Sequence, residues 1–177
     1  GGDGYRTSIP LRSPADDGAA RATFNRWLWY AARRAEYHLD GTVDDFGTED
    51  RRAQALRDSV PILRLTPADQ RELVGRVRIL RYGADEVIQG SGAVPQSMKF
   101  VVAGQVRLAA VGPDGSTVTV RTLEEGDFLG QTALTREPVT AYAVALDEVT
   151  VVEVDREDVE ALVRDNPALL QEIARAI

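Results

Sequence analysis

The sequence predicts an α+β protein, mainly β, in which an antiparallel roll or barrel is flanked by helices at both ends. Apolar residues recur at a helical spacing of about 3.6 before residue 76 and at a spacing of two after it. The β-like runs that follow are short and alternate with glycine turns such as Gly112-Pro-Asp-Gly115. Short strands at even spacing, joined by such turns, are typical of antiparallel rolls and barrels.

The composition limits the classes of function. The chain has 177 residues, a net charge of −7, no cysteine and a single histidine, His38, which we interpret as a helix-end residue. Thiol catalysis, disulfide scaffolds and cysteine zinc sites are therefore excluded, and a histidine metal site or Ser–His relay nearly so. The negative charge argues against a general nucleic-acid partner. No apolar run reaches the roughly 18 to 20 residues that span a bilayer.

The first predicted helix begins at Asp16 or Asp17, because aspartate is a favourable N-cap, and ends near Gly41. Its apolar face recurs at helical spacing and consists of Phe24, Leu28, Ala31 and Ala35. Trp27, Trp29 and Tyr30 widen that face. So many aromatic side chains are unusual on one helix. We expect them to pack either on the following domain or on a part of the protein outside this chain.

Two more helices precede the strands and others follow them. One begins at Thr48 and is expected to end at Pro61. The next has Thr66 as its N-cap, with proline at the first helical position, and ends at Gly75. After the strands, Asp155 is expected to cap a final helical part that is interrupted at Asn166-Pro167. The last apolar pattern is still running at the end of the chain, so we expect that helix to continue beyond it.

The strand pattern predicts which side chains face the core. From residue 98 to residue 110, every second position carries an apolar residue or glycine, namely Met98, Phe100, Val102, Gly104, Val106, Leu108 and Ala110. This pattern indicates one long strand, or two strands bent at Gly104. The returning run from Thr117 to Leu123 is expected to point Val118 and Val120 inward. Residues 142–146 and 149–154 are further strands.

The stretch from Leu123 to Ala145 interrupts this pattern. A β-like run stops at Gly126, a one-turn helix from Gln131 to Leu134 follows Gly130, and Pro138 ends it. Backbone N–H groups at a helix start point outward together, and the local dipole favours negative charge. The stretch therefore predicts a compact seat for an anion.

Residues from about 61 to 177 resemble the cyclic nucleotide-binding domain of the catabolite activator protein, kinase regulatory subunits and gated channels. The resemblance is carried by Pro61–Pro67, by Tyr82–Ile88, by Phe100–Val106 and by Gly126–Gln131, which resembles the G-D-x-F-G-E entry of the family's phosphate-binding cassette. The resemblance implies an eight-stranded β-roll and a non-enzymatic, regulatory domain. It also implies a set of ligand-binding positions, namely Gly130, Gln131, Thr132, Ala133, Val139 and Thr140.

Two of these positions depart from the family pattern. Gln131 stands where the family has a glutamate that accepts a hydrogen bond from the ribose 2′-hydroxyl, and Val139 stands where an arginine pairs with the cyclic phosphate. Losing a buried charge-assisted contact costs about 2 to 5 kcal/mol. We therefore expect weak or absent binding of cAMP and cGMP, through a cassette whose backbone donors from Gly130 to Ala133 remain. Another small anion is also a possible ligand; no metal is expected.

Three arginines are candidates to replace the missing cation. Arg136 lies in the loop before Pro138 and is expected to be a solvated loop residue. Arg107 and Arg121 are expected at solvent-facing strand positions. None of them is therefore predicted to replace the arginine that the family uses.

A second resemblance covers residues from about 7 to 41. The run from Trp27 to Gly41 resembles the closing helix of the cytoplasmic domain of small-conductance mechanosensitive channels, which in some bacterial members precedes a cyclic nucleotide-binding domain. The resemblance implies three parts: a helical end of a channel domain (1–41), an acidic linker and helix (42–66) and a nucleotide-binding-like domain (67–177). It also implies a homo-oligomer on the cytoplasmic side of the cell membrane, tied to the membrane only by the channel part of the parent protein.

Three classes of function remain open. The first is a sensor domain of a mechanosensitive-type, cyclic nucleotide-gated-like channel. The second is the effector domain of a catabolite activator-type transcription regulator, without its DNA-binding part. The third is a ligand-free structural or interaction module. An enzyme is not expected, because the paired carboxylates Asp44-Asp45 and Glu49-Asp50 are typical of a solvated acidic linker and no nucleophile–base or phosphate-loop spacing occurs.

Overall fold

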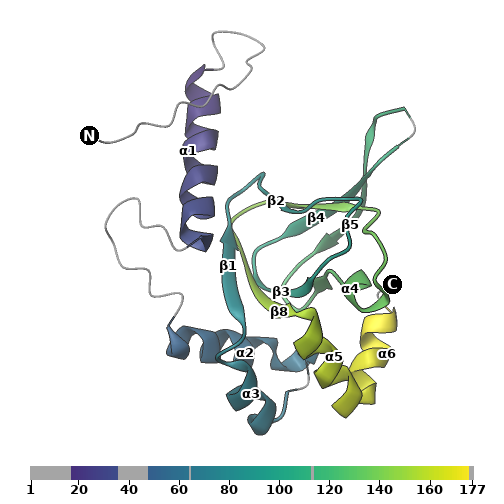
Figure 1. The fold of residues 1–177 in the computed structure, drawn as a ribbon. Coiled ribbons are helices and arrows are strands. Elements are labelled where there is room, and N and C mark those ends of the chain that lie inside the picture. The colour runs from purple at the N-terminus through teal and green to yellow at the C-terminus, as the bar shows by residue number, and fades with distance from the viewer. Residues whose placement is uncertain (1–16, 36–47, 64, 113, 176–177) are drawn as a thin grey trace.

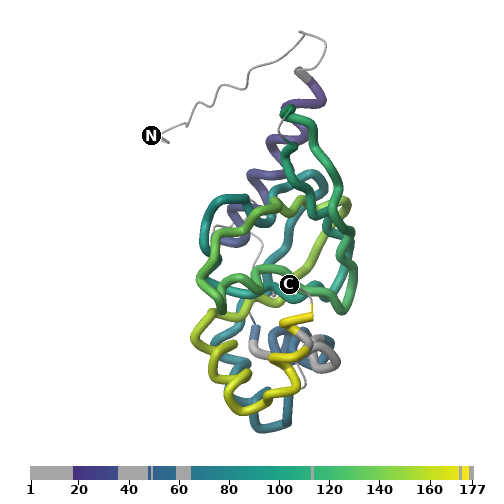
Figure 2. Tube along the Cα trace, turned by 90° about the vertical axis from the view of Figure 1, so that its right-hand side faces the viewer, coloured from purple at the N-terminus to yellow at the C-terminus, as the bar shows by residue number. Residues whose placement is uncertain are grey.

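The computed structural model describes residues 17–35, 48–63, 65–112 and 114–175. Helices α1 (Asp17–Arg34), α2 (Glu49–Leu63) and α3 (Pro67–Leu73) precede the strands, and α5 (Arg156–Asp165) and α6 (Pro167–Arg175) follow them. Figure 1 shows α2, α3, α5 and α6 gathered at one end of the strands, whereas α1 stands alongside β1 (Arg78–Tyr82). Seen from the side, the same helices again lie at one end of the roll (Figure 2).

Eight antiparallel strands form two four-stranded sheets, which confirms the predicted fold class. The remaining strands are β2 (Val87–Gln89), β3 (Ser97–Ala103), β4 (Val106–Val111), β5 (Thr117–Leu123), β6 (Phe128–Leu129), β7 (Tyr142–Ala145) and β8 (Val149–Asp155). The first sheet has the order β1-β8-β3-β6 and the second β2-β7-β4-β5. The one-turn helix α4 (Thr132–Thr135) lies between β6 and β7.

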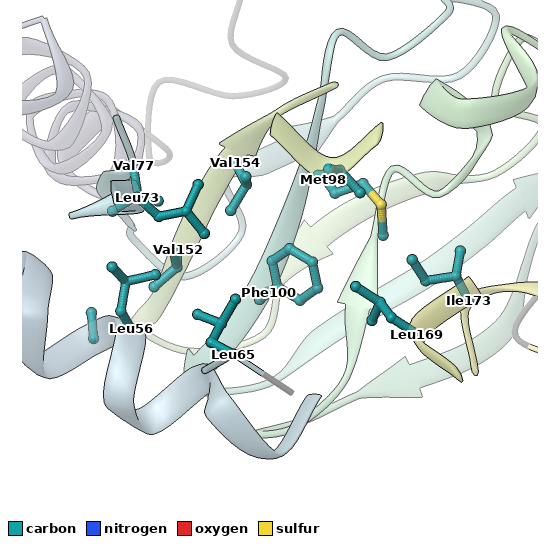
Figure 3. Packing of buried hydrophobic residues seen from close by; sticks show 12 residues of the cluster. Leu56, Leu65, Leu73, Val77, Met98, Phe100, Val152, Val154, Leu169 and Ile173 are labelled. Carbon is teal, nitrogen blue, oxygen red and sulfur yellow. The ribbon is translucent and has the colours of Figure 1, made fainter. Parts of the chain in front are cut away.

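The β3–β8 pair separates two hydrophobic clusters, because alternate side chains of each strand point to opposite faces. Phe100 and Val152 face the helices and pack with Leu56 of α2 and Leu169 of α6 (Figure 3). Their neighbours Val101 and Val151 face the interior of the roll. Both faces of this strand pair are therefore buried, and the helices are needed to cover one of them.

A charged row crosses the same sheet. Glu153 of β8 is paired in register with Arg78 of β1 and Lys99 of β3. Its carboxylate lies 3.0 Å from both Arg78 Nη2 and Lys99 Nζ, and it accepts a 2.7 Å hydrogen bond from Ser97 Oγ. Burial opposes ionisation, but the Ser97 hydrogen bond and the Lys99 charge together hold the pKa of Glu153 below its ordinary value. The row is a fully paired structural cluster.

The helix starts follow the sequence prediction more closely than the ends. Thr66 caps α3 in a reciprocal capping box with Asp69, and Pro67 occupies its first position. The prediction that Pro61 ends α2 is wrong, since α2 continues to Leu63. A proline this close to the end removes only one hydrogen bond of the last turn. The expected end of α1 near Gly41, His38 and the pair Asp44-Asp45 lie outside the described residues.

The predicted apolar face of α1 contacts the roll only through its aromatic extension, Trp27 and Tyr30. Leu28 is 46% exposed, and Ala31 and Ala35 are exposed as well. The helix contacts the roll through Tyr30 and Arg34, which hydrogen-bond to residues of the roll. Polar contacts, which hydrophobic periodicity does not register, thus decide how α1 is oriented.

The expectation that Val118 and Val120 point inward is also wrong, because they are 55% and 63% exposed. The β4–β5 register shifts after Leu108: Leu108 pairs with Arg121, whereas Ala109 pairs with Thr119. Val120 is left without a partner by this bulge. The hairpin that carries both valines extends away from the helical end of the molecule (Figures 1 and 2).

Replacing Phe100 by alanine should destabilise the protein by about 3 to 5 kcal/mol, because a fully buried ring at the centre of the helix-facing cluster is lost. The matched control Val120→Ala removes an exposed side chain and should change the free energy of unfolding by less than about 0.5 kcal/mol. Urea denaturation measures both. If both variants lost the same free energy of unfolding, the hairpin would be buried and the described core would be misassigned.

Candidate functional site

The predicted anion seat is reached from β5 through a turn that is anchored to β3. Gly126 has a φ of 95°. Asp127 fixes the turn by accepting hydrogen bonds from Arg121 Nη2 (2.6 Å) and from the backbone N–H of Glu124 (3.0 Å). Two backbone bonds join Val101 to Asp127 and Gly126. The entry to the seat is thus held rigidly against the central strand pair.

Gly130 places the seat itself against β3. Its φ is 84°, and a Cβ at this position would lie 2.6 Å from the carbonyl oxygen of Ser97. Both the backbone conformation and the close approach require glycine here. The Gln89 side chain of β2 also reaches this glycine, with Oε1 3.4 Å from the same position. Ser97 and Gln89 therefore shape the seat, although no pattern in the sequence marked them.

The helical turn α4 begins directly after Gly130. The backbone N–H of Ala133 donates to the Gly130 carbonyl (2.9 Å), so the expectation that this amide remains available as a ligand donor is wrong. A tight turn satisfies its own amides by such short-range bonds. The side chain of Ala133 is fully buried, and Thr132 Oγ1 is buried without a hydrogen-bond partner in the described part of the chain. Thr132 is thus the polar side chain at this seat whose hydrogen-bonding capacity is unused.

Beyond α4, the chain is fixed again at Val139. The backbone of Val139 donates to the Ala93 carbonyl (3.0 Å) and accepts from the N–H of Gly92 (2.7 Å), both in the β2–β3 connection. Its side chain is partly buried, and the next residue, Thr140, is exposed. The position where the resemblance implies an arginine is therefore well ordered, but it carries an uncharged side chain.

The three candidate arginines differ in exposure and in the pairing of their charges. Arg136 caps α4 in a left-handed conformation (φ 59°) and is exposed, as predicted. Arg121 is half exposed, but its charge is paired with Asp127. Arg107 is partly buried, and its Nε is buried without a hydrogen-bond partner in the described residues. Arg107 lies on the face of β4 opposite to the buried Val106, which faces the roll interior.

The structure thus brings the six predicted positions into one short stretch with a defined backbone. Gly130 to Ala133 form the seat and its helical turn, and Val139 and Thr140 follow it. Within the described part of the chain, no group of acidic or histidine side chains is arranged to hold a metal ion. None of the described helices is long and apolar enough to cross a membrane.

Comparison with known proteins identifies this architecture. Residues 79–166 match the family model of the cyclic nucleotide-binding domain. Among solved structures, the chain is similar to the catabolite activator protein of Thermus thermophilus (26% identity, TM-score 0.55, 63% of this chain and 53% of that one). No curated protein sequence matches the chain.

Two further structures share the fold at lower identity. One is the regulatory subunit of a cAMP-independent protein kinase A from Trypanosoma brucei (17% identity, TM-score 0.63, 72% of this chain and 48% of that one). The other is the corresponding Trypanosoma cruzi subunit bound to guanosine (19% identity, TM-score 0.57, 67% of this chain and 44% of that one). The chain spans about half the length of each of these three structures.

Alanine substitutions of three glycines should form a graded series. Gly90→Ala, with open space around it, should change stability by less than about 0.5 kcal/mol. Gly126→Ala adds backbone strain alone and should cost about 1 to 2 kcal/mol. Gly130→Ala adds the same strain and a clash with Ser97, which should cost about 1 to 3 kcal/mol more. Thermal unfolding of the three variants measures the order, and a Gly130→Ala protein as stable as Gly90→Ala would contradict the described seat.

Proposed function

We propose that the chain is a regulatory sensor domain of the cyclic nucleotide-binding type, whose family model matches residues 79–166, and that its cassette binds cAMP and cGMP weakly or not at all. One observation carries the proposal: the backbone of Val139 is fixed by two hydrogen bonds to the β2–β3 connection, and its side chain carries no charge. A cyclic phosphate placed there would lose its water without gaining a cation. Domains of this family are typically regulatory and non-enzymatic, which agrees with the absence of catalytic motifs from the sequence.

The other side chains of the cassette support the same proposal. Gln131 can donate to or accept from a hydroxyl, but without the assistance of a charge. Arg121 is already paired with Asp127, at 2.6 Å. Thr132 Oγ1 offers a buried, unused hydroxyl to a neutral group. The candidate site residues Gly130, Gln131, Thr132, Ala133, Val139 and Thr140 therefore suit a polar, uncharged ligand better than an anion.

A ligand without a phosphate has a precedent among the structural neighbours. The Trypanosoma cruzi subunit, of a cAMP-independent kinase, is bound to guanosine, and a triple mutant of the Trypanosoma brucei subunit is bound to cAMP in its A site. These neighbours support nucleosides as the ligand class to test on this chain. The triple mutant with bound cAMP also supports testing substitutions in the cassette of this chain.

We place the domain in a mechanosensitive-type, cyclic nucleotide-gated-like channel on the strength of the N-terminal resemblance. In this proposal residues 1–41 end the channel domain, residues 42–66 link the two parts and residues 67–177 form the sensor. The parent protein would be a homo-oligomer, and the domain would lie on the cytoplasmic side of the cell membrane. Tyr30 and Trp27 of α1 contact the roll, so these two side chains do not themselves require the channel domain as a partner.

Two alternatives have an observation of their own. The similarity to a catabolite activator protein favours the effector domain of a transcription regulator. The exposed valines of the β4–β5 hairpin, Val111, Val118 and Val120, favour an interaction module that needs no ligand. Ligand titration separates the sensor from the interaction module.

The test is calorimetric titration with cAMP, cGMP and guanosine of the unaltered chain and of Val139→Arg/Gln131→Glu. The double variant should bind cyclic nucleotide some tens- to thousands-fold more tightly than the unaltered chain, since it regains a charge-assisted contact of about 2 to 5 kcal/mol. Val111→Arg adds the same positive charge on the exposed hairpin and is the matched control, in which affinity should not change.

Two outcomes would overturn the proposal. Tight binding of cAMP or cGMP by the unaltered chain would show that the cassette does not need the missing charges. No binding of any of the three compounds by either protein would favour the ligand-free interaction module.

A further inference from the structure

Helix α1 is fastened to the roll by an ion pair that is largely shielded from water. Arg34, in its last turn, donates through both terminal nitrogens to the Glu86 carboxylate and through Nη1 to the Arg81 carbonyl (2.6 Å). The side chains of Arg34 and Glu86 are only 19% and 11% exposed. The guanidinium carbon also lies 4.4 Å from the centre of the Tyr82 ring. An ion pair in this setting has a defined geometry and depends on both partners.

Glu86 is also bonded within its own turn. Its Oε2 accepts the backbone N–H of Gly83 at 2.9 Å, which ties the carboxylate to the β1–β2 turn. Gly83 lies directly against α1, because a Cβ there would be 2.7 Å from two ring atoms of Tyr30. Asp85, in the same turn, has a φ of 67°. The turn is therefore shaped around the helix and does not merely lie beside it.

A second contact joins α1 to the β7–β8 turn. The Tyr30 hydroxyl donates to Glu148, whose other oxygen lies 3.4 Å from Arg81 Nη2. Burial and the hydrogen bond to Glu148 raise the pKa of Tyr30 to about 12, so the phenol remains a donor at neutral pH. Figure 1 shows the C-terminal end of α1 close to the end of β1.

The strand pair β2–β7 connects these contacts with the cassette. At one end, Asp85 N–H donates to the Ala145 carbonyl (2.8 Å) and Ala145 N–H donates to the Glu86 carbonyl (2.9 Å). At the other end, Val139 exchanges two backbone bonds with Gly92 and Ala93, which follow β2. Between them, β7 pairs with β2 in antiparallel register. The cassette and the α1 contacts are thus opposite ends of one hydrogen-bonded ribbon.

We propose that the β2–β7 ribbon couples the conformation of the cassette at Val139 to the docking of α1 on Glu86 and Glu148. A conformational change in the cassette would thereby be transmitted to α1. A change that moves Val139 shifts β7 and with it the backbone that positions Glu86. Coupling of this kind is reciprocal, so releasing α1 also changes the cassette. The inference rests on the proposed function only for the nature of the ligand, because the coupling itself can be measured without one.

The test compares amide hydrogen exchange in the unaltered chain and in Arg34→Ala. Loss of the ion pair should accelerate exchange in α1. It should also accelerate exchange at Ala145 and Val139 by about fivefold or more, at the low end of typical coupling between sites. The matched control is Arg57→Ala, which removes an exposed arginine of α2 and should change none of these rates. If α1 is released while Ala145 and Val139 keep their rates, the proposal is wrong. It is equally wrong if α1 exchange does not change.

A general loss of stability is recognised separately. Faster exchange of the Phe100 and Val152 amides in Arg34→Ala would indicate a general loss of stability. In that case Tyr30→Phe is measured instead, because it removes only the hydroxyl that bonds Glu148. That variant should accelerate amide exchange in α1 and at Ala145 and leave the exchange rates of the central strands unchanged. Unchanged exchange at Ala145 would overturn the coupling.

Measurements of ligand affinity distinguish a failure of this inference from a failure of the proposed function. The cyclic GMP affinity of Val139→Arg/Gln131→Glu should change about fivefold or more when Arg34→Ala is added. If the double variant binds no cyclic GMP at all, the proposed function fails and the exchange measurements alone decide the coupling. If it binds with the same affinity in both backgrounds, the coupling fails and the proposed function stands.

Discussion

The β3–β8 pair is buried on both faces, and α2, α6, the second sheet and the cassette are all packed against it. Phe100 and Val152 need the helices to cover them, which fixes α2 and α6, while Val101 and Val151 need the second sheet, which closes the roll. The cassette is attached to the same strands, since Gly130 presses against Ser97 and Asp127 bonds to Val101. A shift of this pair would therefore disturb the core and the site together.

In the proposed function, the cassette keeps the backbone shape of the family but lacks the two charged side chains. Its conformation comes from the two glycines at positive φ and from backbone bonds, none of which depends on a ligand. Charge selectivity depends instead on single side chains, and those at Gln131 and Val139 are neutral. Because the two properties reside in different atoms, a cassette can lose affinity for cyclic phosphate while its fold remains. The docking of α1 depends on a charged and an aromatic side chain, since Arg34 pairs with Glu86 and the Tyr30 ring lies against Gly83.

Much of the fold was predictable because it depends on local patterns. Alternating apolar residues gave the strands, and Thr66 with Pro67 marked the start of α3. The six candidate site positions came from the resemblance to the cyclic nucleotide-binding family, whereas the local sequence marked Gly130 and the one-turn helix after it. The errors arose where the tertiary structure decides: both faces of β5 are exposed from Thr117 to Thr122, and an ion pair to Glu86 holds the C-terminal end of α1 against the roll. The contributions of Ser97 and Gln89 to the seat could not be predicted, since both come from other strands.

The central claim is that the cassette is preformed and lacks the charges for a cyclic phosphate. Amide hydrogen exchange at Ala133 and Leu134, which bond to the Gly130 and Gln131 carbonyls, tests both parts in one measurement. The account predicts protected amides in the ligand-free protein and no added protection at about 1 mM cyclic GMP. Amides that exchange freely without the nucleotide and become protected when it is added would contradict the account.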